Sequence, residues 1–200
     1  CASYMNIWVC NLGGGLLGYA QFPGGACNTD GVVILYSAFG RISSYPSYNL
    51  GRTTSHEFGH CFNLRHIWGD DGTACSGSDQ VTDTPNQAGE HYGCPCQTIT
   101  CSNAVNGDMY QNIMDYTDDA CMFMITAGQA TRMNLCVTTS RPGLITSLGS
   151  TPVTTYAHDV EVTSVVTPLG NPRLNATNML TPKILLTNWG TNSENKIPVR

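Results

Sequence analysis

The pattern of apolar and polar residues changes along the chain, and the segments near both ends have the pattern of β-strands. Residues 4–12 (YMNIWVCNL) and 32–39 (VVILYSAF) are rich in β-branched and aromatic residues and are bounded by turns with Gly or Pro, so both are predicted strands. Residues 16–22 (LLGYAQF) are a candidate third strand. Residues 158–166 (HDVEVTSVV) and 183–189 (KILLTNW) have the same character near the other end.

The middle of the chain contains two segments with helical spacing. From about Asn49 the apolar residues form an approximate stripe, and Asn49 can cap the first turn. Residues 126–129 (TAGQ) have the Thr-x-x-Gln form of a capping box, so a second helix should follow Thr126 and end before Pro142. Residues 69–112 are mostly Gly, Asp, Ser, Asn, Cys and Pro, and such a long irregular stretch requires disulfides or bound ions to hold it.

These elements predict an α+β domain over residues 1–145, a Ser/Thr/Gly/Pro linker over 146–157 and the start of an all-β module over 158–200. Two strands do not make a stable sandwich, so we expect the sandwich-like module to be truncated and to continue past Arg200.

Composition and charge argue against two classes of protein, nucleic-acid-binding proteins and membrane-spanning proteins. The charged fraction is 12% and the formal net charge is −5, so the chain lacks the basic footprint of a nucleic-acid-binding protein. No apolar run approaches the roughly 18 residues needed to cross a bilayer, so no membrane span is expected. A soluble protein that binds neither nucleic acid nor a lipid core is predicted.

The chain has 10 cysteines, which suggests an oxidising compartment and several disulfides. Cys94 and Cys96 are too close to bridge each other, so each should pair with a more distant cysteine, and the nearest choices are Cys75, Cys101 and Cys121. The alternative is a structural zinc cluster, which is less favoured because Cys-x-x-Cys is absent. Its candidate ligands are Cys94, Cys96, Cys101, Cys121 and His91.

Three of the five histidines lie within HEFGHCFNLRH, residues 56–66. On a helix, His56 and His60 share one face and can present imidazole nitrogens to one ion. A continuing helix would carry His66 about 9 Å further along the axis, so the helix must break first. Asn63 is placed for that break, because Asn tolerates the left-handed conformation that ends helices.

Three neutral imidazoles on one zinc leave the fourth tetrahedral position for water, as in catalytic sites. The carboxylate of Glu57, one residue after the first histidine, can lie beside the metal and accept a proton from that water. The alternative is that these histidines are hydrogen-bonded core residues and that HExxH arose by chance. A third histidine at this offset makes that alternative much weaker.

The sequence HExxHxxNxxH, followed 48 residues after His66 by the methionine of NIMDY (112–116), resembles the signature of metzincin zinc endopeptidases, HExxHxxGxxH plus a Met-turn. The segment LGRTTSHEFGHCFNLRHIWGDD, the DTP at 83–85, NIMDYTDDACMFMITAGQATRM and the cysteine-rich stretch most resemble the pappalysin/cytophagalysin family. The match covers about residues 4–140. Only about fifty residues precede the first helix, fewer than a metzincin sheet normally has, so the resemblance implies further N-terminal strands upstream. Asn63 departs from the clan's usual Gly, although the cytophagalysin branch often carries Asn there.

The resemblance implies a metzincin-like zinc peptidase domain with an active-site helix and a Met-turn, secreted or displayed at the cell surface and acting on peptide or protein substrates. It also implies individual roles: zinc ligation for His56, His60 and His66, the general base for Glu57, the apolar floor under the metal for Met114, and oxyanion stabilisation for Tyr116. For Met114 and Tyr116 the alternative is ordinary core packing. The substrate would add as a strand to a sheet edge; VVILYS is either that edge or a buried strand.

Calcium is a further expectation. Nine of the 14 acidic residues lie between residues 70 and 119, and no Lys or Arg occurs from 66 to 131. Calcium would neutralise and brace such a loop, and the resemblance also suggests it. The candidate ligands are Asp70, Asp71, Asp79 and Asp83. The alternative is a solvated acidic loop held by disulfides, since no EF-hand spacing is present.

Two other functions remain open at this point. A surface-binding or structural protein could keep a zinc-braced fold without peptidase activity, although a purely structural site has no use for Glu57. A zinc hydrolase acting on a non-peptide bond is the second alternative.

Overall fold

The computed structural model describes residues 3–41, 44–102, 106–151, 156–167 and 183–195. The chain divides into two compact units, Cys1–Gly149 and Ser150–Arg200. The linker expected over residues 146–157 spans this division. Helices and strands are both present, as the α+β prediction requires.

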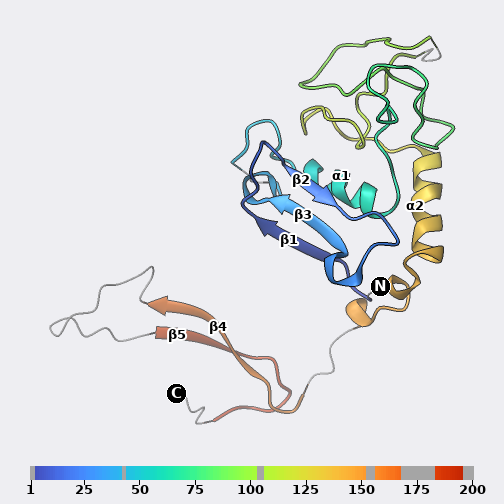
Figure 1. The fold of residues 1–200 in the computed structure, drawn as a ribbon. Coiled ribbons are helices and arrows are strands. Elements are labelled where there is room, and N and C mark those ends of the chain that lie inside the picture. The colour runs from blue at the N-terminus through green and yellow to red at the C-terminus, as the bar shows by residue number, and fades with distance from the viewer. Residues whose placement is uncertain (1–2, 42–43, 103–105, 152–155, 168–182, 196–200) are drawn as a thin grey trace. The chain divides into compact units, whose positions relative to one another are not determined.

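The first unit contains a three-stranded sheet, formed by β1 (Asn6–Cys10), β2 (Gly18–Ala20) and β3 (Gly31–Leu35). β3 is the central strand, parallel to β1 and antiparallel to β2 (Figure 1). Val32 and Ile34 of β3 are fully buried. Of the two alternatives for VVILYS, the buried strand is therefore confirmed and the substrate-binding edge is wrong. β1 and β2 form the two edges of this sheet.

The first helix, α1 (Arg52–Cys61), packs against β2 and β3. The predicted cap at Asn49 is wrong: the N-cap is Gly51, two residues later, and it adopts the left-handed conformation with φ 83°. Cys61 at its end is buried in one apolar cluster with the interior residues of β3. This contact fixes the face of α1 that carries the histidines relative to the sheet.

The second helix, α2 (Ala127–Thr139), has the predicted capping box. The Gln129 N–H donates to Thr126 Oγ1, and the Thr126 N–H donates to Gln129 Oε1. The prediction that this helix ends before Pro142 is confirmed. Short 3₁₀ helices span Cys27–Thr29, Tyr36–Ala38, Pro142–Leu144 and Leu148–Ser150.

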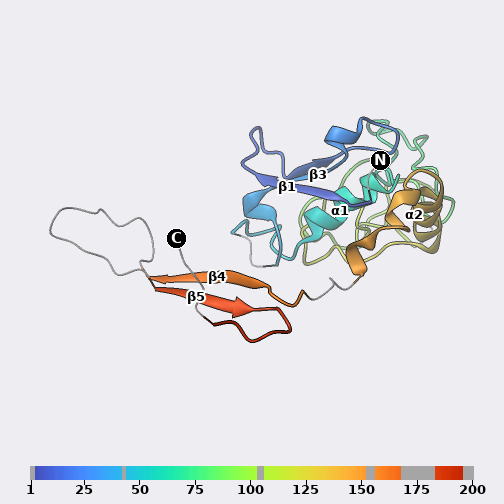
Figure 2. The ribbon, with the colours of Figure 1, turned by 90° about the horizontal axis from the view of Figure 1, so that it is seen from below.

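A buried ion pair joins the end of α2 to the sheet. Arg141 donates to both carboxylate oxygens of Asp30, with a distance of 2.7 Å from Nη2 to Oδ1, and its Nε donates to the carbonyl oxygen of Cys61 at 2.9 Å. Both views place α1 between the sheet and α2 (Figures 1 and 2). Arg141 therefore connects all three layers of the first unit.

The segment between the two helices is mostly irregular, and disulfides brace it. Cys75 pairs with Cys101 and Cys94 pairs with Cys121, which confirms the disulfide prediction. The alternative cysteine zinc cluster does not form, because three of its thiols are in these disulfides. The expected partner for Cys96 is wrong, since Cys96 is an exposed free thiol.

The second unit contains a two-stranded antiparallel sheet of β4 (Val160–Thr167) and β5 (Lys183–Asn188). Both strands were predicted. Among the residues that the structure describes, no helix is long and apolar enough to cross a membrane.

Candidate metal centre

The end of α1 returns the chain towards its own histidines. Asn63 has φ 73°, in the left-handed region. The Leu64 N–H donates to the Gly59 carbonyl at 2.8 Å, and the Asn63 N–H donates to the His60 carbonyl at 2.9 Å. These two hydrogen bonds are those of a Schellman motif, which ends a helix and reverses the chain. His66 thereby approaches the helix face it has just left.

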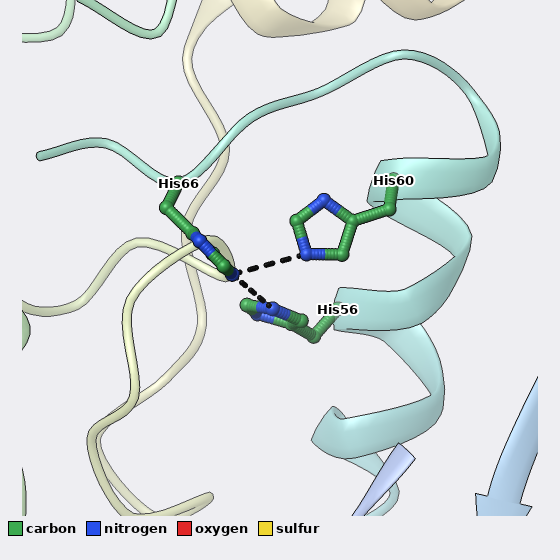
Figure 3. A group of neighbouring side chains, drawn as sticks. All are labelled: His56, His60 and His66. Carbon is green, nitrogen blue, oxygen red and sulfur yellow. Dashed lines mark hydrogen bonds between the residues drawn. The ribbon is translucent and has the colours of Figure 1, made fainter. Parts of the chain in front are cut away.

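Three imidazole nitrogens meet at one point (Figure 3). The Nε2 atom of His66 lies 3.3 Å from that of His56 and 3.1 Å from that of His60. Two nitrogens bound to one tetrahedral zinc at 2.0–2.1 Å would lie about 3.3–3.4 Å apart. The observed separations are therefore close to those of ligands on one shared ion.

The other ring nitrogens show which atoms carry the protons. Each Nδ1 has an acceptor: the Ile113 carbonyl at 2.7 Å from His56, the Leu64 carbonyl at 2.9 Å from His60, and Asp70 Oδ1 at 2.7 Å from His66. A neutral imidazole that donates from Nδ1 has a lone pair on Nε2. Three such lone pairs facing one another would repel without a cation between them. The arrangement is that of metal ligands oriented by outer hydrogen bonds.

The electrostatic environment keeps two of these rings neutral. The pKa of His56 is held well below its usual value, mainly by burial and to a smaller extent by the nearby His60 and His66. Burial and the neighbouring His66 lower the pKa of His60 to about 4. Neutral imidazole is the form that binds metal. Among the described residues, the three histidines are the one group of three or more metal-binding side chains whose ligand atoms lie within 4.8 Å of one another.

Glu57 lies beside this group in a cavity of about 330 Å³ that His56 also lines. Its side chain is buried, and burial raises its pKa to about 8. Gly18 of β2 faces it: a Cβ there would lie 2.9 Å from both Cγ and Oε1 of Glu57. The glycine at the start of the edge strand therefore leaves room for the carboxyl group.

Met114 is fully buried in an apolar cluster that includes Leu64 and Trp68, and its sulfur faces Gly59 of α1. Its N–H donates to Asn112 Oδ1 at 2.9 Å. The Asn112 amide exchanges two hydrogen bonds with the buried amide of Gln129, at 2.8 and 3.0 Å. The turn that carries Met114 is thus attached to the first turn of α2.

The Tyr116 hydroxyl lies 3.0 Å from His66 Nε2. Trp68 stacks on His66 with ring centroids 4.3 Å apart, and its ring meets Tyr116 edge-on. Burial raises the pKa of Tyr116, so the phenol keeps its proton at neutral pH. It is therefore a hydrogen-bond donor beside the metal-binding point.

The family of this chain follows from its similarity to known proteins. Residues 1–138 match the peptidase M43 family, described as pregnancy-associated plasma protein-A. The chain belongs to this family. Its predicted membership of the pappalysins and its metzincin-like fold class are confirmed.

Two curated relatives in fungi are named extracellular metalloproteases. That of Colletotrichum graminicola is 42% identical over 125 residues, which cover 59% of this chain and 44% of the relative. That of Podospora anserina is 40% identical over 136 residues, which cover 65% and 45%. The chain thus spans about half the length of the curated relatives it matches.

A solved structure is also similar. Mature mirolysin of Tannerella forsythia, in complex with a cleaved peptide, is 53% identical with a TM-score of 0.66 over 70% of this chain and 56% of that one. Mirolysin is a metzincin.

The four candidate calcium ligands of this family member do not converge. Asp70 accepts from His66, and Asp71 accepts from Ser76 Oγ at 3.0 Å. Asp79 accepts from Val81 N–H and Thr84 Oγ1. Asp83 accepts from Gly128 N–H and Thr126 Oγ1 at the start of α2. Each carboxylate thus has its own protein donors, and a calcium site remains a prediction.

Sequence reasoning missed several residues that line the cavity: Gly18, Tyr92, Asp115 and Asp119. Asp115 lies inside the NIMDY motif and could have been noticed there. Asp119 Oδ2 accepts from the N–H groups of Leu50 and Arg52, whereas its buried Oδ1 has no hydrogen-bond partner among the described residues. No local pattern in the sequence identifies Gly18 or Asp119 as cavity residues, because their partners are distant along the chain.

Proposed function

We propose that this chain contains the catalytic core of a secreted zinc endopeptidase, with His56, His60 and His66 as the zinc ligands. The carrying observation is the convergence of three Nε2 atoms whose rings all donate from Nδ1, with the buried Glu57 beside them. Two facts support peptide cleavage outside the cell: relatives are named extracellular metalloproteases, and mirolysin was solved with a cleaved peptide.

Glu57 is the proposed general base. Bound zinc would supply Lewis-acid chemistry, polarising the scissile carbonyl and acidifying water. Glu57 takes a proton from the attacking water as oxygen bonds to the carbonyl carbon, and it delivers that proton to the amine nitrogen as the peptide bond breaks. A carboxyl group whose burial moves its pKa towards neutrality suits both transfers.

Tyr116 is the proposed oxyanion donor. Its phenol keeps its proton and lies 3.0 Å from a ligand nitrogen, where the carbonyl oxygen of a bound substrate would gain negative charge. A preoriented donor at that position lowers the energy of the tetrahedral transition state more than that of the substrate.

The cavity indicates how a substrate would bind. Residues 15–17 and Gly18, the first residue of the edge strand β2, line it, so an extended peptide can add along this edge. Asp119 also lines the cavity, and its Oδ1 lacks a protein donor. A guanidinium or ammonium group would provide one, so we expect cleavage beside a basic residue.

The test combines metal analysis with cleavage. The chain should contain zinc and cut a peptide library; a chelator should abolish cutting and added zinc should restore it. Glu57→Gln should retain zinc but lose about 10²–10⁴-fold in rate. Glu161→Gln, in the second unit, is the matched control and should cut normally.

Full cleavage by Glu57→Gln would refute the mechanism. A zinc-loaded parent that cuts no peptide would favour a zinc-braced binding protein, and turnover of an ester alone would favour a different zinc hydrolase.

A further inference from the structure

A histidine outside the metal centre lies between two buried carboxylates. His91 Nδ1 is 2.9 Å from Asp115 Oδ2, and His91 Nε2 is 3.3 Å from Asp108 Oδ2. Both aspartate side chains are 0% exposed, whereas that of His91 is 13% exposed. No Lys or Arg occurs between residues 66 and 131, so His91 is the side chain of this segment that can carry a positive charge beside both aspartates. Buried carboxylates require such a partner.

The Asp115 carboxylate is fully hydrogen-bonded. Oδ1 accepts from the backbone N–H groups of His91 and Tyr116, both at 2.8 Å. Oδ2 accepts from Gln87 Nε2 at 2.8 Å and from the His91 ring. This one side chain therefore attaches the backbone of Tyr116 to residues 87–91.

The same two segments are held together further along. The Asp118 N–H donates to the Gly93 carbonyl at 2.9 Å, and the Cys94–Cys121 disulfide follows. At the other end, the Tyr116 phenol lies 3.0 Å from His66 Nε2. A displacement of Asp115 would thus move Tyr116 relative to the histidines, because the two residues are adjacent and share a hydrogen bond.

We propose that His91 is a positioning residue, which acts through Asp115 to hold the Tyr116 phenol at the metal centre. The inference rests on the proposed function, since it concerns how the Tyr116 phenol is held in its catalytic position. His91 touches neither the zinc ligands nor the cavity beside Glu57, so its effect would be transmitted entirely through the Asp115 carboxylate.

Protonation of His91 strengthens this link. The hydrogen bond to Asp115 raises the pKa of His91 against the opposing effect of burial, with further contributions from the charges of Asp115 and Asp108. The adjacent titratable groups, Glu90 and Tyr92, are exposed and interact with each other. Because the folded pKa is raised, the stabilisation is complete below about pH 6.5 and is lost as the pH rises through the folded value.

Two substitutions separate the two contacts of the ring. His91→Asn keeps an N–H donor near the position of Nδ1, facing Asp115, and His91→Gln keeps one near Nε2, facing Asp108. We expect His91→Gln to lower kcat about tenfold with KM within about twofold, whereas His91→Asn should retain most of the activity. His158→Gln, an exposed histidine of the second unit, is the control.

A double-mutant cycle tests the route. In a Tyr116→Phe background, His91→Gln should change kcat by less than about twofold, because the phenol it positions is gone. A full, additive loss in that background would overturn the proposal. Parental kcat in His91→Gln would also overturn it.

A further readout is independent of these losses. With Co²⁺ in place of zinc, His91→Gln should alter the visible spectrum as Tyr116→Phe does. If the parent protein cuts no peptide, the proposed function is refuted. The cobalt spectra still test the positioning role of His91 in that case: an unchanged spectrum of His91→Gln refutes that role.

Discussion

Gly59 in the third turn of α1 provides a sharp test of how the helix rests on the Met114 turn. A Cβ added at Gly59 would lie less than 3.0 Å from Met114 Sδ, 3.2 Å from Met114 Cε and 3.5 Å from Leu64 Cδ1. Gly59 has an ordinary helical φ, so backbone strain does not contribute. The predicted effect of Gly59→Ala is therefore a collision with Met114 alone.

Two opposing contributions determine how much Gly59→Ala changes the free energy of unfolding. Ala is about 1 kcal/mol better than Gly inside a helix. Overpacking a filled core costs about 1–3 kcal/mol, and the upper part of this range applies because both Gly59 and Met114 are fully enclosed. We expect Gly59→Ala to lower the free energy of unfolding by about 1–2 kcal/mol. Because His60 follows Gly59, zinc affinity should fall as well.

The assay is a double-mutant cycle on the metal-free chain, in which denaturant unfolding measures the free energy of unfolding of each variant. Met114→Ala alone removes a buried side chain and should cost about 2–5 kcal/mol. In the Met114→Ala background the methyl group introduced by Gly59→Ala has space, so that substitution should be neutral or stabilising. Gly13→Ala, where a Cβ meets nothing within 4 Å, is the matched control. Equal losses from Gly59→Ala in both backgrounds would refute the proposed contact.

Three further outcomes are expected. Gly18→Ala should bind zinc normally but cleave peptides at least about tenfold more slowly, because its Cβ would displace the Glu57 carboxyl; normal kcat would contradict this. Asp30→Asn should lower the free energy of unfolding by about 3–5 kcal/mol, because it breaks the buried ion pair with Arg141. Since Arg141 lowers the pKa of Asp30, the parent should lose this stability as the pH falls through the folded pKa, and denaturant unfolding of the variant should show no such loss. Asp119→Asn should reduce the preference for basic residues in cleavage-site mapping, and unchanged site preference would show that Asp119 does not select substrates.

The sequence was most informative where structure is set by near neighbours. The i, i+4 spacing placed His56 and His60 on one face, and the position of His66 required a break that Asn63 supplies. The capping box of α2 was readable for the same reason, because its hydrogen bonds join residues three apart. Local geometry fixes these features whatever the rest of the fold does.

Features that depend on distant segments were not readable. Whether VVILYS is central or at the edge depends on β1 and β2, since an apolar run suits both positions. The roles of Gly18 beside Glu57 and of His91 beside Asp115 arise only when strands and loops far apart in sequence meet. The acidic residues were grouped as one calcium site because they are close in sequence, yet their carboxylates accept hydrogen bonds from different partners.

Buried polar contacts explain why so irregular a segment can carry a metal-binding geometry. Asn112 and Gln129 are 0% exposed and satisfy each other, and Asp115 has four donors. Hydrogen bonds are directional, so a saturated buried group permits one backbone arrangement where an apolar contact of similar strength permits several. The Met114–Tyr116 turn follows Asn112 and contains Asp115. The position of this turn, whose Tyr116 hydroxyl lies 3.0 Å from His66 Nε2, is therefore fixed by both groups, which the apolar cluster around Met114 would not achieve by itself.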